Sequence, residues 1–191
     1  MRHPPNLTGG RVTPPLPDED HVDRIIREWA QEYPSLDTEA MAVIGRILRI
    51  ARYLERDVEL ELGRFGLSIS EFNALSALRR HGEPHALSPT ELSRGLMLSS
   101  GGLSKLVERL EARGLVVRTP DQTDGRGVVV ALTPAGRELQ EAAIEAHVAN
   151  ENELLGPLDT DARDEVNRLL RTLLIAFEGN AGRMRPGGVR S

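Results

Sequence analysis

The spacing of apolar residues predicts helices along most of the chain. A first helix is expected over 18–33, where apolar residues recur every three or four positions and Pro34 ends the pattern. A long helix is expected over 37–64, and two further helices over 133–154 and 159–178. The segment between these long helices carries shorter elements of its own.

Three short helices are expected between residues 68 and 114, each with its own start signal. The sequence S-x-x-E at 68–71 and again at 88–91 is a capping box, in which the serine and the glutamate each accept a backbone N–H of the first turn. Ser99 or Ser100 begins the third helix, and Gly114 ends it.

The pattern then changes from helix to strand. Valine-rich stretches at 115–119 and 127–132 flank a polar turn at 120–126, which predicts a β-hairpin. Three short helices followed by a hairpin are the element order of a winged helix-turn-helix. The predicted fold class is therefore mainly α (α+β), a winged helix-turn-helix with long N- and C-terminal helices.

The two long terminal helices have apolar stripes but no partner within so small a lobe, which predicts dimerisation. We expect the following organisation: a disordered arm over 1–17, an added N-terminal helix over 18–36, dimerisation helices over 37–66 and 133–178, a winged helix-turn-helix lobe over 67–132 and a flexible tail over 179–191.

Composition narrows the possible functions. Cysteine is absent from the 191 residues, which excludes a disulfide scaffold, a thiolate nucleophile and a cysteine-ligated metal. Apolar runs reach only five residues and no leader is evident, so we expect a cytoplasmic protein that does not enter a membrane. The net charge of −5 disfavours a non-specific polyanion binder. We expect no metal and no cofactor.

The third short helix, over 99–113, is the candidate recognition helix. Its apolar stripe must face the protein, and its other face then carries small and basic residues that suit a major groove about 12 Å wide. The candidate DNA-binding residues on this helix are Ser99, Ser100, Gly101, Ser104, Lys105 and Arg109. The alternative is an ordinary amphipathic helix whose polar face is solvated.

The hairpin tip is the second candidate DNA contact. Arg126 lies between two glycines, where it can enter a narrow and electronegative minor groove. Asp121 or Asp124 would orient Arg126 or Arg118 through charge-assisted hydrogen bonds. We therefore add Asp124, Arg126 and Gly127 to the DNA-binding residues. The alternative is a solvated polar turn.

These segments resemble known regulators. Residues 118–136 (RTPDQTDGRGVVVALTPAG) resemble the wing signature of MarR-family transcriptional regulators, and 110–116 and 88–92 resemble the flanking helices of that family. The similarity covers residues 40–178. It implies a homodimer that binds a pseudo-palindromic operator in double-stranded DNA, usually as a repressor released by a small molecule.

Segments 22–29, 33–46 and 66–72 are similar to the urate-responsive branch of this family, in which an added N-terminal helix supplies a tryptophan to a ligand pocket. The expected ligand-binding residues are Trp29, Arg46, Asn73, His85, Leu106 and Arg118. Asn73 and Leu106 replace an aspartate and an arginine of that branch. Losing two charged hydrogen bonds, at about 1.5–3 kcal/mol each, disfavours urate as the ligand. The alternative role for Trp29 is to anchor the added helix.

Two functions remain open from sequence. The first is a ligand-responsive DNA-binding regulator. The second is a small-molecule- or protein-binding scaffold of the same fold that has lost tight DNA binding, which the acidic net charge favours. The change Arg126→Ala separates them, because it weakens specific DNA binding by about 1–3 kcal/mol only in the first. An enzyme is a distant third, since no catalytic motif is present.

Overall fold

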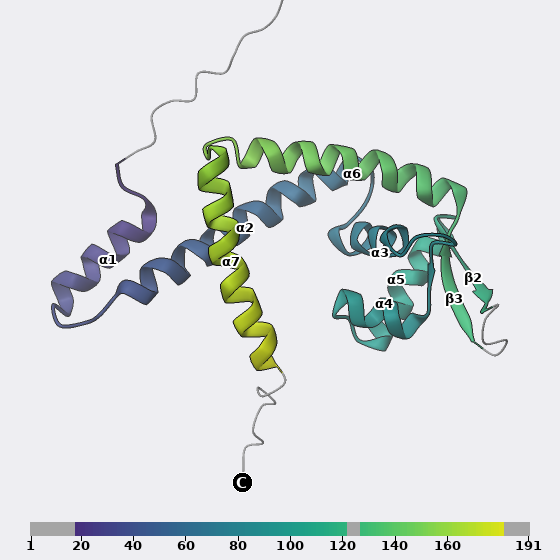
Figure 1. Ribbon diagram of the computed structural model, residues 1–191, viewed down its shortest axis with the longest axis horizontal. Helices are drawn as coiled ribbons and strands as arrows, with labels where there is room; N and C mark the ends of the chain where they lie inside the picture. The colour runs from purple at the N-terminus through teal and green to yellow at the C-terminus, as the bar shows by residue number, and fades with distance from the viewer. Residues whose placement is uncertain (1–17, 122–126, 182–191) are drawn as a thin grey trace, which may run out of the picture. The chain divides into compact units, whose positions relative to one another are not determined.

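The computed structural model describes residues 18–121 and 127–181. Its elements are mainly helical, with one small antiparallel sheet (Figure 1). In chain order they are α1 (His21–Glu32), α2 (Glu39–Gly63), α3 (Ile69–Arg80), β1 (Ala86–Leu87), α4 (Pro89–Leu96), α5 (Ser100–Ala112), β2 (Val116–Pro120), β3 (Val128–Leu132), α6 (Pro134–Leu154) and α7 (Thr160–Ala181). The chain divides into two compact units, Met1–Tyr53 and Leu54–Ser191.

In the first unit, α1 is fixed to α2 by three charged side chains. Asp20 and Asp23 form a capping box, in which each carboxylate accepts the other residue's backbone N–H, at 2.9 and 3.0 Å. Their remaining oxygens accept hydrogen bonds from Arg46 of α2. Beside this group, which we call the Arg46 clamp, buried Val22 packs against Gly45, where an added Cβ would lie 3.3 Å from the valine side chain. A glycine at this point lets the two helices approach closely.

The second unit contains a winged lobe with a continuous aliphatic core. Figure 1 shows α3, α4, α5 and the strands gathered in this lobe. Helices α3 and α5 each turn apolar residues inward at helical spacing, which buries one face of each helix. The largest fully buried side chains are Leu62, Leu75, Leu78, Leu92, Leu106, Leu110, Val107 and Val130.

The sheet has the strand order β1–β3–β2, and both pairings are antiparallel. Arg118 of β2 and Leu87 of β1 both pair with Val130 of β3, so the hairpin is tied to the segment between α3 and α4. Strand β1 was not predicted from the sequence, because a strand of two residues is too short to show an alternating pattern.

The junction between the hairpin and α6 is tightly packed. The hydroxyl of Thr133 donates to the carbonyl of Gly114 at 2.7 Å and accepts the backbone N–H of Gly136 at 3.0 Å. A Cβ at Gly136 would lie 1.9 Å from the carbonyl oxygen of Leu115. Only glycine therefore fits at 136 with this backbone, and the start of α6 is locked to the end of α5.

The structure confirms the predicted fold class and the capping residues Ser68, Ser88 and Ser99. The tail predicted from residue 179 was wrong at its start, since α7 continues to Ala181, because a single glycine close to a helix end costs only about 1 kcal/mol. The expected arm over 1–17 and the rest of the tail lie outside the described residues. Within the described ranges, no helix is long and apolar enough to cross a membrane.

Candidate nucleic-acid interface

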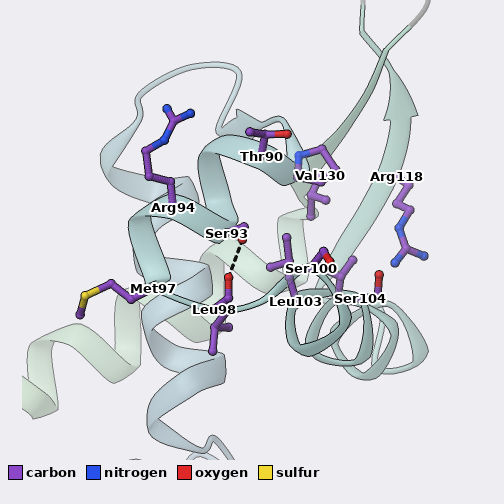
Figure 2. Close-up of a pocket in the computed structure, with 12 residues that line it drawn as sticks. Thr90, Ser93, Arg94, Met97, Leu98, Ser100, Leu103, Ser104, Arg118 and Val130 are labelled. Carbon is purple, nitrogen blue, oxygen red and sulfur yellow. Dashed lines mark hydrogen bonds between the residues drawn. The ribbon is translucent and has the colours of Figure 1, made fainter. Parts of the chain in front are cut away.

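A short turn sets the start of the candidate recognition helix α5. Met97 ends α4 in the left-handed conformation, with φ of +52°, and its side chain is 93% exposed. The hydroxyl of Ser93 donates to the carbonyl of Leu98 at 2.6 Å, which closes the turn (Figure 2). The hydroxyl of Ser99 then accepts the N–H of Gly102 at 3.2 Å as the cap of α5. The remaining N–H groups of the first turn are available to an anion.

Helix α5 is divided lengthwise into a buried and an exposed face. The buried face consists of Leu103, Leu106, Val107 and Leu110. All six predicted DNA-binding residues of this segment, Ser99, Ser100, Gly101, Ser104, Lys105 and Arg109, are exposed. Nothing lies within 4 Å of a Cβ placed at Gly101, so another molecule could approach the backbone closely there. Lys105 is also the only lysine in the sequence.

The C-terminal turns of α5 are held by Glu71 of α3. Its carboxylate lies 3.8 Å from the guanidinium of Arg109 and 3.6 Å from that of Arg113. Burial raises the pKa of Glu71, but the N–H and hydroxyl of Ser68 and the two arginines outweigh burial and leave the pKa below its usual value. Glu71 therefore stays charged and links the start of α3 to α5. Only the capping role of Glu71 was evident from the sequence, because its contact with Arg109 joins residues more than 35 positions apart.

A second carboxylate connects α5 to the hairpin. Glu111 accepts the backbone N–H of Arg118 at 3.1 Å and also pairs with the Arg118 guanidinium. Glu111 therefore holds Arg118 from the helix side. Orientation of Arg126 or Arg118 by Asp121 or Asp124, which was expected from sequence, stays a prediction. Glu111 and Arg118 are seven positions apart across the helix–strand turn, and no short motif marks such a pair.

A cavity of about 570 Å³ lies between α4, α5 and the base of the hairpin (Figure 2). Leu103, Val107 and Val130 form an apolar wall, while Ser104 and Arg118 contribute polar groups. Further lining residues are Pro89, Thr90, Ser93, Arg94, Met97, Leu98 and Ser100. This volume falls within the range of small-molecule sites. The cavity shares Ser100 and Ser104 with the exposed face of α5.

The predicted ligand-binding residues lie in different environments. Arg118 lines the cavity, Asn73 is exposed on α3, and Leu106 is part of the hydrophobic core at 2% exposure. His85 is buried, with Nε2 2.9 Å from a guanidinium nitrogen of Arg79.

Two of these residues belong to the first unit. Trp29 is 39% exposed and packs against Tyr33, with ring centroids 5.8 Å apart. Arg46 is engaged in the Arg46 clamp. A ligand-binding role for all six residues stays a prediction.

The predicted wing contacts are only partly described. Asp124 and Arg126 lie outside the described residues. Gly127 is described, and its carbonyl accepts the N–H of Asp121 at 2.8 Å, which continues the hairpin beyond the last strand pair. DNA contact by these three predicted residues stays a prediction.

Comparison with known proteins agrees with this geometry. Residues 65–127, which contain α3, α4, α5 and β2, match the model of the MarR family. The chain is 35% identical over 149 residues to the HTH-type transcriptional regulator PecS of Dickeya dadantii, which covers 78% of this chain and 90% of that protein.

Two solved structures have the same fold. AbsC, a MarR family transcriptional regulator from Streptomyces coelicolor, matches with a TM-score of 0.66 and 27% identity over 75% of this chain and 97% of its own. A mutant of MarR from E. coli, complexed with operator DNA, matches with a TM-score of 0.62 and 25% identity over 73% of this chain and 99% of its own. The protein belongs to the MarR family of DNA-binding transcriptional regulators.

Proposed function

We propose that the protein is a homodimeric, ligand-responsive repressor that leaves a pseudo-palindromic operator when a small molecule binds. The observation that carries this proposal is the exposed N-terminal half of α5, where a serine cap, Gly101 and Lys105 lie beside free backbone donors. Small residues permit close approach to DNA, and the lysine offers a positive charge to phosphate or guanine. Occupying an operator in this way blocks transcription sterically.

A dimer is supported by the apolar side chains of the long helices. Helix α7 exposes Val166, Leu169, Leu170, Leu173, Leu174, Ile175 and Phe177. Helix α2 exposes Met41, Val43, Ile44, Leu48, Ile50, Tyr53, Leu54 and Leu60. Apolar surface of this extent marks an association surface in a folded protein. Two-fold symmetry then presents two α5 helices to half-sites about one helical turn apart.

Release by a ligand is supported by the cavity beside α5. A molecule with an apolar body and one anionic or acceptor group would match the apolar lining residues Val107 and Val130 and the guanidinium of Arg118. Such a ligand favours the lobe conformation that binds it more tightly. If that conformation does not fit DNA, the affinity for DNA falls by the difference between the ligand's binding free energies for the two conformations. A coupling free energy of about 1–3 kcal/mol between ligand binding and DNA binding is sufficient to release a repressor.

The first experiment is fluorescence anisotropy with DNA from upstream of the protein's own gene, at several salt concentrations. We expect sequence-selective binding that weakens with salt. Lys105→Ala should weaken binding about tenfold or more, while Arg56→Ala, which removes an exposed positive charge from α2, should change it less than twofold. Arg126→Ala tests the predicted wing contact in the same assay.

The ligand site is tested by screening small aromatic acids for release of DNA. For any active compound, Arg118→Met should raise the concentration needed for release by tenfold or more. Trp29→Phe tests whether the first unit takes part. If no DNA fragment from a genome-wide selection is bound, the repressor proposal is refuted and the scaffold alternative, which the acidic net charge favours, takes its place.

A further inference from the structure

The charged side chains of α5 and of Arg113, the residue that caps its C-terminus, fall into two classes. Arg109 and Arg113 both pair with Glu71, and Glu111 pairs with Arg118. The side chains of Lys105 and Glu108, by contrast, form no ion pair or hydrogen bond with any residue in the described part of the chain, and both residues are exposed. The paired residues help to hold the lobe together, and Lys105 and Glu108 are the charged residues of α5 whose side chains have no partner in the described part of the chain.

These two side chains share one side of the helix. Residues three apart on a helix are neighbours about 5–6 Å apart, and Ser104 and Gly101 precede them on the same exposed face. The buried stripe of α5 lies on the opposite side. A helix placed in a major groove by this face therefore brings a positive and a negative group to adjacent base pairs.

A carboxylate is an unusual group to bring to DNA, because the phosphates repel it. Because the Glu108 side chain pairs with no basic residue in the described part of the chain, it is favourable there where it accepts a hydrogen bond from a base. In the major groove, guanine O6 and N7 and thymine O4 are acceptors, so they reject it. Adenine offers an N6 amino donor but places the N7 lone pair beside it. Cytosine offers its N4 amino group with no acceptor of its own next to it, and is the base that Glu108 fits best.

We propose that Glu108 is a specificity-determining residue that selects cytosine at one position in each half-site, while Lys105 supplies attraction to the neighbouring base pair or phosphate. This inference rests on the proposed DNA-binding function, and it adds a base identity to it. Repulsion by Glu108 lowers affinity for DNA that lacks this cytosine, so the residue improves discrimination more than affinity.

The experiment is selection and sequencing of bound DNA from a random library, with the full chain. It compares the wild-type protein with Glu108→Gln, Glu108→Ala and the control Glu145→Gln, which removes an exposed charge from α6. Folding of each variant is checked by thermal unfolding, since both glutamates are exposed.

We expect the wild type and Glu145→Gln to share one motif with at least tenfold enrichment of cytosine at one position per half-site. Glu108→Gln should shift that position towards adenine, whose N6 and N7 match an amide, and Glu108→Ala should lose the preference. Both Glu108 variants should bind random DNA more tightly than the wild type.

Two results would overturn the proposal in distinguishable ways. If wild type and both Glu108 variants select the same motif, Glu108 does not read a base, although DNA binding stands. If the wild type selects no motif and binds no fragment above the level of random DNA, the DNA-binding function fails and this inference fails with it.

Discussion

At the scale of single residues, the lobe depends on side chains that are small or absent. Of the glycines that the structure describes, Gly136 has the least room for a Cβ, and the obstacle is backbone rather than a movable side chain. Lys105 differs from Gly136 in both respects, because it has a long side chain and is exposed to solvent, where it can contact another molecule. Both follow from position, since the first sits where two elements meet and the second on the free face of α5.

Gly136→Ala should lower the free energy of unfolding by about 2–4 kcal/mol, because α6 must move away from Leu115 to admit the methyl group. Urea unfolding followed by circular dichroism measures the change. Gly179→Ala is the matched control, since nothing lies within 4 Å of its Cβ position in α7. An equal loss of stability in both variants would contradict the steric explanation.

Operator DNA should protect Lys105 from amine-specific reductive methylation. Because the sequence has no other lysine, only the amino terminus competes for the reagent, and mass spectrometry distinguishes the two sites. We expect methylation of Lys105 to slow at least fivefold in the presence of operator DNA and not in the presence of random DNA at high salt. Equal labelling with and without operator would place Lys105 away from the interface.

At the scale of elements, ion pairs add to the hydrophobic contacts that hold neighbouring helices together. The Arg46 clamp fixes the start of α1, and Glu71 joins α3 to α5. The backbone N–H of Asp23 and the guanidinium of Arg46 together lower the pKa of Asp20 to about 2. A carboxylate whose pKa is depressed in the folded state stabilises the fold at pH values above its unfolded-state pKa, which is near 3.8. That stabilisation is lost as the pH falls towards 2.

Release of α1 should therefore occur between pH 4 and pH 2, and it should be visible as a change in fluorescence of Trp29, the only tryptophan. Arg46→Met should produce the acid spectrum already at pH 7. Arg49→Met, on the same helix, should retain the wild-type profile, since Arg49 contacts Tyr53 rather than the clamp. An identical pH profile in the wild type and in Arg46→Met would refute the clamp's role.

Local elements were predictable from sequence, and the contacts between them were not. Capping boxes and apolar spacing identify α3, α4 and α5 because their causes lie within four residues. Strand β1 and the bonds from Glu71 and Glu111 depend on partners brought together by folding. Leu106 illustrates the conflict, since its spacing places it in the core stripe while the family resemblance places it in a ligand site, and the structure buries it.

At the scale of the whole molecule, association is the expected consequence of the long helices. Leu173 of α7 is 38% exposed and lies within the apolar run of that helix. Burying such side chains against a second copy would contribute about 25 cal/mol for each Å² of apolar surface removed from water, which favours association.

Leu173→Asp should convert a dimer to a monomer and weaken operator binding at least a hundredfold, because half-sites are then bound independently. Size-exclusion chromatography with light scattering gives the mass, and anisotropy gives the affinity. Arg171→Asp on the same helix alters charge more strongly but leaves the apolar run intact, so it should remain dimeric. A wild type that elutes as a monomer at micromolar concentration would contradict the dimer.

The bond between Glu111 and Arg118 has a consequence for how the protein would leave its operator. It ties the end of α5 to the first strand of the wing, and we expect this bond to couple the positions of the two parts. A loss of binding free energy at the major groove then also weakens the contact with the minor groove. The effects of variants at Lys105 and Arg126 should therefore be non-additive in a double-mutant cycle. Breaking the tie with Glu111→Gln should make the two losses independent. If the two losses are coupled in this way, we expect the protein to dissociate from DNA in a single step rather than by releasing one groove at a time.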